Sequence, residues 1–377
     1  MDRETCIYAS KLLGRHWESP PAYERFCQRG ASVDYIKAES FTYLDFFKGY
    51  LLPNFPCVFS SAFTQGWGSR KYWVTQDGKP NFDHLLRNFG DAVVPVANCN
   101  VQEYNSNPKE QILLRDYISY WKEYIEGNHS SPKGCLYLKD WHLYVFHSYS
   151  WSVNVCGRKR WLLYPPGQEE SLRDHHGNLP YDVTSSALLD TSVYPEYPKC
   201  CPPIEIIQEA GEMIFVPSGW HHQVYNLDDT ISINHNWMNG CNVATMWHFL
   251  QAELDAVQQE ICEWRETMED WHQHCQVIMK SCTGIDYKEF YNFLKIIAEK
   301  RISLLEKVPE TKALKNICSD SPGLGPHHAT FDLSRIADVL ASLITNPYFQ
   351  KLETDALSPA PEDLFSHLKE IINASSL

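Results

Sequence analysis

The chain has 377 residues, of which 44% are hydrophobic and 13% aromatic, so it can bury a full hydrophobic core. This composition excludes a disordered tail and a small disulfide-stapled domain. The 33 Lys and Arg residues against 47 Asp and Glu give a formal net charge of −14. So acidic a chain gains little from releasing the counterions of DNA or RNA, which argues against nucleic acid as the main ligand, whereas a basic protein partner is easier to accommodate.

Cysteine usage indicates the compartment. The 13 cysteines are odd in number and lie scattered from Cys6 to Cys318, without a C-x-x-C pair. This pattern is typical of reduced thiols in the cytoplasm, with the nucleus also open. The adjacent Cys200 and Cys201 lack zinc-ligand spacing, so we interpret them as loop thiols. No apolar run approaches bilayer length and no leader pattern occupies the first residues, so we expect a soluble chain without a membrane partner.

Regular patterns are sparse in the first part of the chain. Residues 1–38 show no clear periodicity, and we expect them to form a loosely attached N-terminal arm. Thr42 is a candidate N-cap with Asp45 three residues later, and the apolar stripe that follows predicts a helix. We also predict a short buried strand at 57–59 and a second helix at 114–125.

After residue 134 the pattern changes to short strands separated by turn residues. A three-residue hairpin loop with a glycine is expected at 156–158. Short strands at this spacing favour a barrel or a sandwich. The predicted strands cover residues 135–138, 150–155, 159–164, 204–208, 212–216, 221–226 and 230–237.

Beyond residue 240 apolar residues recur at alternating intervals of four and three, which predicts a long helix with an a/d seam. The seam consists of Val243, Trp247, Leu250, Leu254, Val257, Ile261 and Trp264. It requires another helix to cover it, either from a second copy in a homodimer or from the same chain, with candidates Phe290, Leu294 and Ile297. We therefore expect three parts, namely the arm at 1–38, a strand-rich domain at 39–240 and a C-terminal helical region at 241–377.

Polar side chains follow one face of the last two predicted strands. His222 and Asn226 share a face of the strand at 221–226. One face of the next strand carries a row of four small polar residues, namely Thr230, Ser232, Asn234 and Asn236. Such a row is costly in a sealed core, so we expect it to line a wet pocket inside a barrel. The alternative is that His221 and His222 are ordinary strand histidines, one exposed and one hydrogen-bonded.

Two stretches resemble the halves of a jumonji-C (JmjC) domain. They read Trp151-x(7)-Lys159-Arg-Trp161-x-Leu-x-Pro165 and Val216-Pro-x-Gly-Trp-x-His222-x-Val-x-Asn226-Leu. The resemblance implies an α+β fold in which residues 39–240 form a cupin-like double-stranded β-helix, with helices before and after it. It also implies an oxygenase that uses Fe(II) and 2-oxoglutarate to hydroxylate a lysine of a protein substrate, a translation release factor.

The resemblance assigns individual residues as well. His222 takes the place of the family's distal iron ligand, and Lys159 that of the lysine that pairs with the far carboxylate of 2-oxoglutarate. Asn234 falls where the family hydrogen-bonds the same carboxylate, and Tyr137 where a tyrosine completes the clamp. A dicarboxylate needs a fixed cation and donors at its distal end, which agrees with this assignment. Without the resemblance, Lys159 reads as an exposed hairpin lysine.

The family's second metal-binding motif is incomplete at the position where this sequence should carry it. The family holds iron with two His and one carboxylate, of which the first His and the carboxylate come from one H-x-D or H-x-E motif on a strand. At that register the sequence reads His142-Leu-Tyr144, and a phenol with a pKa of about 10 stays neutral. We interpret this as an internal deletion of several tens of residues near 143–145, with His142 in register by chance.

Three functions stay open at this point. The chain is either a 2-oxoglutarate-dependent oxygenase with an incomplete iron site, or a catalytically silent splice-type variant that acts only through binding or dimerisation. A cupin-like zinc or binding protein is the third, but it needs three or four ligands in one pocket, of which the sequence offers His222. Removing a core strand leaves its neighbours with unpaired backbone groups. We therefore expect an incomplete barrel.

Overall fold

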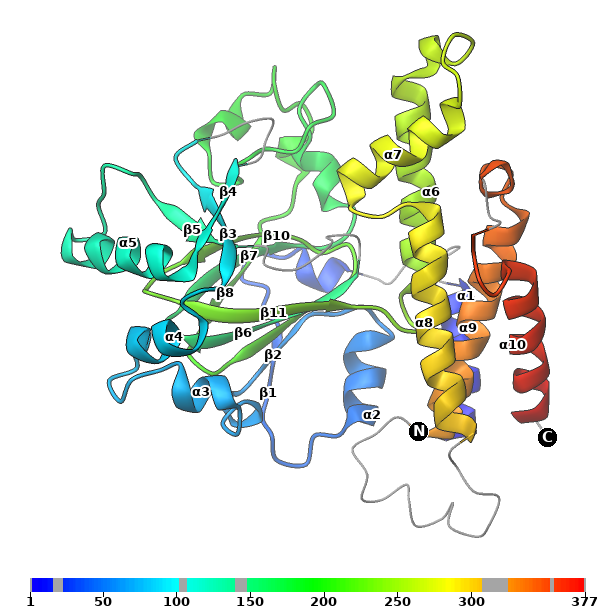
Figure 1. Cartoon of the computed structure of the whole chain (residues 1–377), viewed down its shortest axis with the longest axis horizontal. Helices are drawn as coiled ribbons and strands as arrows, with labels where there is room; N and C mark the ends of the chain where they lie inside the picture. Colours follow the sequence, from blue (N-terminus) through cyan, green and yellow to red (C-terminus); the bar gives the residue numbers. More distant parts are fainter. Residues whose placement is uncertain are drawn as a thin grey trace.

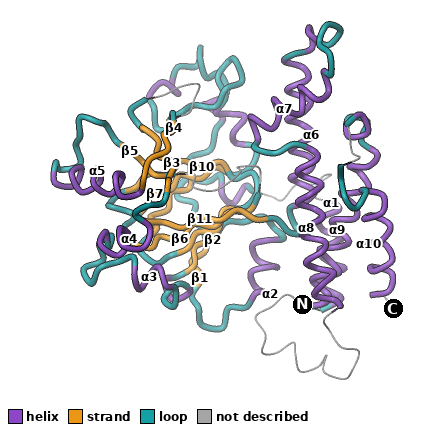
Figure 2. The backbone as a smooth tube through the Cα atoms, viewed as in Figure 1, coloured by secondary structure: helices purple, strands orange, loops and turns teal. Residues whose placement is uncertain are grey.

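The computed structural model describes residues 2–15, 23–101, 107–139, 148–306, 325–352 and 356–375. The strands gather on one side of the molecule and the long C-terminal helices on the other, with the N-terminal helix among them (Figure 1). A tube coloured by secondary structure shows the same division (Figure 2). The expected α+β fold with an incomplete, cupin-like barrel is confirmed.

Two sheets carry the strands of the barrel. The larger has the order β1-β2-β9-β6-β11 and the smaller the order β10-β7-β8. The pair β1 and β2 is parallel, and every other pair in the two sheets is antiparallel. The strands are β1 (Asp34–Ile36), β2 (Cys57–Phe59), β6 (Tyr149–Cys156), β7 (Lys159–Tyr164), β8 (Ile204–Gln208), β9 (Met213–Val216), β10 (His221–Asn226) and β11 (Ile231–Trp237).

Apolar side chains of both sheets meet between them. The buried cluster includes Trp161, Leu163, Ile204, Ile206, Ile214, Val216 and Trp220. Since side chains alternate along a strand, residues of the same parity on these strands face the same interior. Lys159 on β7, Ser152 on β6 and His222 on β10 therefore point into the barrel.

A third sheet, in the order β4-β3-β5, lies beside the barrel. Its antiparallel strands are β3 (Val93–Asn98), β4 (Lys109–Leu113) and β5 (Leu136–Leu138). The helix α5 (Leu114–Glu126) buries Tyr117 and Ile118 against this sheet, and Gly127 caps its end. The helix expected at 114–125 is thus confirmed. Shorter helices α3 (Gly68–Tyr72) and α4 (Phe82–Phe89) precede the sheet.

Residues 1–38 differ from the loosely attached arm that we expected. They contain α1 (Arg3–Arg15) and β1, which extends the larger sheet. The helix α1 buries Ala9 and Leu13 in a cluster with Phe331 of α9 (Pro326–Thr345). The boundary at residue 38 therefore separates no independent unit.

The helix predicted after Thr42 is present. Thr42 and Asp45 form a reciprocal capping box at α2 (Tyr43–Phe46), and the chain continues as a π-helical turn at Phe47–Leu51. This segment packs on the outer face of the larger sheet, where Phe46 contacts Phe215 with ring centroids 5.0 Å apart.

The hairpin predicted at 156–158 is wrong, because β6 and β7 belong to different sheets. Gly157 has φ +74°, and a Cβ atom at this position would lie 2.7 Å from the Asp229 carbonyl oxygen. Gly157 does mark a turn, as predicted, but this turn carries the chain from one sheet to the other. Consecutive strands in opposite sheets are what a double-stranded β-helix requires.

Both sheets end on a strand of the candidate site. Among the described residues, β10 pairs only with β7, and β11 pairs only with β6. His222 lies on the first of these edge strands and Asn234 on the second. This pairing leaves the barrel open on the side where we expect the deletion.

The C-terminal helices form their own core. They are α6 (Val243–Glu260), α7 (Trp271–Thr283), α8 (Tyr287–Glu306), α9 and α10 (Pro361–Ser375). The predicted seam is buried from Val243 to Val257 and is covered by helices of the same chain, including Phe290 and Leu294 of α8. Trp264 lies beyond the end of α6 and is 54% exposed, so the seam is shorter than expected. Within the described ranges, no helix combines the length and apolarity needed to cross a bilayer.

Candidate functional site

Lys159 is a buried cation in the interior of the barrel. It is 4% exposed, and strand register places it between Gln208 of β8 and Asn226 of β10. Its Nζ lies 6.0 Å from the centroid of the Trp161 ring, and the described residues supply it with no hydrogen bond or ion pair. Burial lowers the pKa of Lys159 to about 8. The alternative of an exposed hairpin lysine is therefore wrong.

Unpaired polar atoms face the same interior from the larger sheet. Ser152 and Asn154 of β6 are both buried, and their register partners on β11 are Asn234 and Ser232. The Ser152 Oγ and Asn154 Oδ1 atoms have no hydrogen-bond partner among the described residues. Buried polar atoms are rarely left without a partner, so these atoms mark a place for a polar ligand or water.

A buried glutamine joins the two sheets beside Lys159. The Gln208 side chain donates from Nε2 to the carbonyl oxygens of Ser152 at 2.8 Å and Glu212 at 2.9 Å. Its Oε1 accepts a hydrogen bond from Trp161 Nε1 at 2.9 Å. Sequence reasoning missed Gln208, although it shares the inward parity of Ile204 and Ile206 and stands where that apolar row ends.

His222 presents one ring nitrogen to the interior. Its Nδ1 lies 2.9 Å from the Trp220 carbonyl oxygen, which can only accept, so Nδ1 carries the proton and Nε2 keeps a lone pair. The Trp161 ring lies 5.4 Å away, centroid to centroid. Desolvation by the residues packed around the ring lowers the pKa of His222, although the residue is exposed to solvent. His221 points the other way, with Nδ1 3.6 Å from Glu169 Oε2.

The predicted site residues divide among three sheets. Lys159 and His222 share the inner face of the smaller sheet, and because His222 pairs with Leu163, about 13 Å of strand separates them. Asn234 lies on β11 of the larger sheet and is exposed. Tyr137 lies on β5 of the third sheet, opposite Ala97. The strand pairings thus unite the first two residues and leave Tyr137 on a separate sheet.

The described residues do not assemble an iron site. They contain no group of three His, Cys, Asp or Glu side chains that could hold a metal ion. His142 and Tyr144 lie outside the described residues. Of the predicted ligands, only His222 is therefore placed, and one imidazole is too few for the two-His, one-carboxylate centre.

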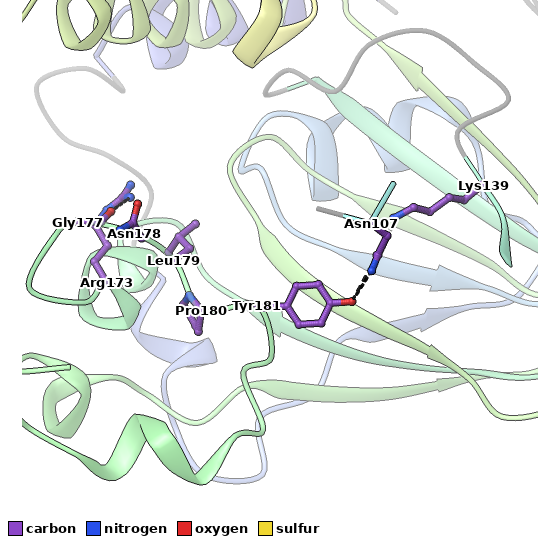
Figure 3. Close-up of a pocket in the computed structure, with 8 residues that line it drawn as sticks. All are labelled: Asn107, Lys139, Arg173, Gly177, Asn178, Leu179, Pro180 and Tyr181. Carbon is purple, nitrogen blue, oxygen red and sulfur yellow. Dashed lines mark hydrogen bonds between the residues drawn. The ribbon is translucent and has the colours of Figure 1, made fainter. Parts of the chain in front are cut away.

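Two cavities lie elsewhere. One of about 600 Å³ is lined by aromatic side chains, including Phe46, Trp67 and Trp151, between α2 and the outer face of the larger sheet. The other, of about 480 Å³, is polar: Asn107 donates to the Tyr181 hydroxyl at 3.1 Å, with Lys139 near Asn107 and a loop from Arg173 on the other side (Figure 3). Neither cavity is lined by Lys159, His222 or Asn234.

Comparison with known proteins agrees with the fold. A family model described as JmjC domain, hydroxylase matches residues 133–237. The 2-oxoglutarate and iron-dependent oxygenase JMJD4 of Homo sapiens is 57% identical, with both chains covered in full. The protein of the same name from Danio rerio is 49% identical over 99% of each chain. The arginine-specific demethylase JMJ20 of Arabidopsis thaliana is 30% identical over 83% of this chain and 79% of its own.

The alignment lengths carry further information. The alignment with the human relative extends over 425 positions, yet this chain has only 377 residues. At least 48 of its positions therefore pair a residue of the human protein with a gap in this chain. A shortfall of this size matches the expected deletion of several tens of residues.

Proposed function

Because this chain belongs to the JmjC-domain hydroxylases, we propose that it binds 2-oxoglutarate through Lys159 but does not turn it over. The relatives named above as oxygenases depend on 2-oxoglutarate and iron. The single observation that carries the proposal is the buried cation without a partner, beside two buried polar atoms that also lack one.

These residues fit the far carboxylate of 2-oxoglutarate. An anion beside Lys159 would replace the hydration that burial removes from its ammonium group, and charge-assisted hydrogen bonds of this kind are among the strongest in proteins. The Ser152 hydroxyl can donate to the same carboxylate. The hydrogen bond between Trp161 and Gln208 holds in place two side chains of the smaller sheet that lie beside Lys159. When iron is also present, 2-oxoglutarate supplies electrons by losing carbon dioxide and becoming succinate.

The residues do not fit iron in the same way. His222 Nε2 is available, but the described residues add no second histidine or carboxylate to it. The register at which the family has a carboxylate holds Tyr144. Binding of the cosubstrate and its turnover are therefore separable in this chain, which supports the catalytically silent alternative over the active oxygenase.

For a form with the missing segment restored, we propose hydroxylation of a lysine in a translation release factor. The net charge of −14 favours a basic substrate segment, since opposite charges steer association. Lysine peptides assayed by mass spectrometry for the gain of one oxygen atom, and methylated arginine peptides assayed for the loss of a methyl group, separate this substrate class from that of the plant relative named an arginine demethylase.

Calorimetric titration with 2-oxoglutarate tests the first part of the proposal. We expect saturable binding to the chain and at least about 30-fold weaker binding to Lys159→Met, because removal of a buried, hydrogen-bonded charge typically costs 2–5 kcal/mol of binding. Lys71→Met is the matched control, since Lys71 is exposed on α3. Equal affinity of Lys159→Met and the unaltered chain would refute the role of Lys159.

A succinate assay with Fe(II) and a reductant tests the second part. We expect no succinate from the chain, and succinate from a chimera that carries the human relative's residues at the gap. The chimera also shows that the assay can detect turnover. Succinate from the unaltered chain would show that its iron centre is complete and would overturn the silent assignment.

A further inference from the structure

Two cysteines face each other at one end of the third sheet, away from the barrel interior. Cys99 follows β3 and Cys135 precedes β5, and the register pair Asn98 and Leu136 places them opposite each other. The Cys99 N–H donates to the Cys135 carbonyl oxygen at 2.8 Å. Opposed residues of antiparallel strands have Cα atoms about 4.5–5.5 Å apart, which lies within the range that a disulfide spans.

The two thiols share a hydrogen bond in which they play unequal roles. The Cys99 thiol donates to the Cys135 sulfur and, with the Tyr124 hydroxyl, lowers the pKa of Cys135 to about 6. The same bond raises the pKa of Cys99, while Lys139 opposes that rise. Tyr117 and Tyr120 are further titratable groups near Cys135. The pair thus combines a thiolate with an adjacent thiol, both partly open to solvent.

We propose that Cys99 and Cys135 form a reversible oxidation site, which a small disulfide such as oxidised glutathione converts into an intramolecular disulfide. The Cys135 thiolate attacks one sulfur of the small disulfide and releases the other half as a thiolate. Cys99 then loses its proton to solvent and attacks the Cys135 sulfur, which releases the second half. The two cysteines lose two electrons together, and one small disulfide becomes two thiols.

A second pair of thiols provides an internal comparison. Cys27 and Cys201 also contact each other, but burial raises the pKa of Cys201 to about 12. Because the thiolate is the nucleophile, Cys201 is less reactive than Cys135 at neutral pH. Oxidation therefore begins at Cys99 and Cys135. The new bond would tie the start of β5 to the end of β3, two residues from Tyr137.

Peptide mapping of the full chain tests the site. The chain is incubated at pH 7 with oxidised glutathione, quenched with an alkylating agent, digested without reductant and analysed by mass spectrometry. We expect a disulfide-linked peptide pair that contains Cys99 and Cys135. Cys99→Ser should stop at a glutathione adduct on Cys135, Cys135→Ser should give neither product, and Cys27→Ser should behave as the unaltered chain.

Alkylation rates give a readout independent of oxidation. From the thiolate fraction and the lower nucleophilicity of an acidic thiol, Cys135 should react with iodoacetamide about tenfold faster at pH 6 than a model thiol of pKa about 8.5, and no faster at pH 8. The proposal fails if Cys135 resists both reagents, if its adduct persists in the unaltered chain while Cys99 stays reduced, or if the Cys27–Cys201 peptide forms first.

Discussion

Replacing Lys159 with methionine isolates the energetic effect of a buried charge. Methionine has a similar length and shape but carries no charge. Lys159 is 4% exposed, and burial lowers its pKa from about 10.5 to about 8. The unfolded chain therefore holds this proton more tightly than the folded chain, and the charge destabilises the fold at neutral pH.

The difference between the two pKa values corresponds to about 3 kcal/mol, at about 1.4 kcal/mol per pKa unit. An unfolding entropy of about 2.1 cal/mol/K per residue gives about 0.8 kcal/mol/K for 377 residues, so about 3 kcal/mol equals about 4 °C in Tm. The penalty is fully present below pH 8, decreases as the pH rises from about 8 to about 10.5, and is absent above that. Lys159→Met should therefore melt about 4 °C higher at pH 7, with convergence near pH 10.5.

Thermal melts followed by near-UV circular dichroism measure both effects. The series compares the unaltered chain, Lys159→Met and the exposed-site control Lys71→Met at three pH values. At one hundred times its Kd for the unaltered chain, 2-oxoglutarate should add about 2.7 kcal/mol to that chain and at most about 0.9 kcal/mol to Lys159→Met, which binds at least about 30-fold more weakly. If Lys159→Met melted at or below the Tm of the unaltered chain at pH 7, the folded chain would already satisfy the ammonium group, and our reasoning would be refuted.

Two further changes, at the turn between the sheets and at a buried ion pair of the C-terminal helices, are tested by urea denaturation. Gly157→Ala should destabilise the chain by at least about 2 kcal/mol, because Gly157 has φ +74° and the new Cβ meets backbone, whereas Gly167→Ala, at φ +92° in open space, should cost only about 1–2 kcal/mol. Equal losses would show that the contact is unimportant. Asp332→Ala should cost about 3–5 kcal/mol by leaving Arg301, whose Nε donates to Asp332 at 2.6 Å, without its partner. Although burial of the carboxyl group acts in the opposite direction, His328 and Arg301 lower the pKa of Asp332. The carboxylate should therefore stabilise the fold above about pH 4 and lose this effect below it. If Asp332→Ala lost the same stability in acid as at neutral pH, this expectation would be contradicted.

The sequence predicted the bounds of the strands better than it predicted which strands pair with one another. The strands β8 and β10 begin and end where they were predicted, because turn residues such as Gly211, Pro217 and Asp228 mark the breaks between the strands. The sequence did not predict which sheet each strand joins. Gly157 satisfies the same backbone requirement in a hairpin and in a turn between sheets, so the residue type alone cannot distinguish the two.

Tertiary contacts explain the other differences. The helix α1 buries little more than Ala9 and Leu13, a stripe too narrow to stand out as a period, and its stability comes from packing against α9. Lys159 has an exposed arginine on either side, Arg158 and Arg160, each paired with an acidic residue. Charge composition alone therefore favoured an exposed lysine, and only strand parity together with both sheets places it inside.

The deletion that we infer affects the two ends of the barrel interior differently. Lys159 and Ser152 lie on β7 and β6, which each have a partner strand on both sides, and Gln208 bridges the two sheets, so the proposed site for the far carboxylate lies among paired strands. His222 lies on β10, which has one neighbour among the described strands, and we expect the deletion on this open side of the barrel. A deletion there removes metal ligands and an edge partner together, while it leaves the carboxylate site on an intact part of the fold. The proposal that turnover is lost while 2-oxoglutarate binding is retained rests on this arrangement.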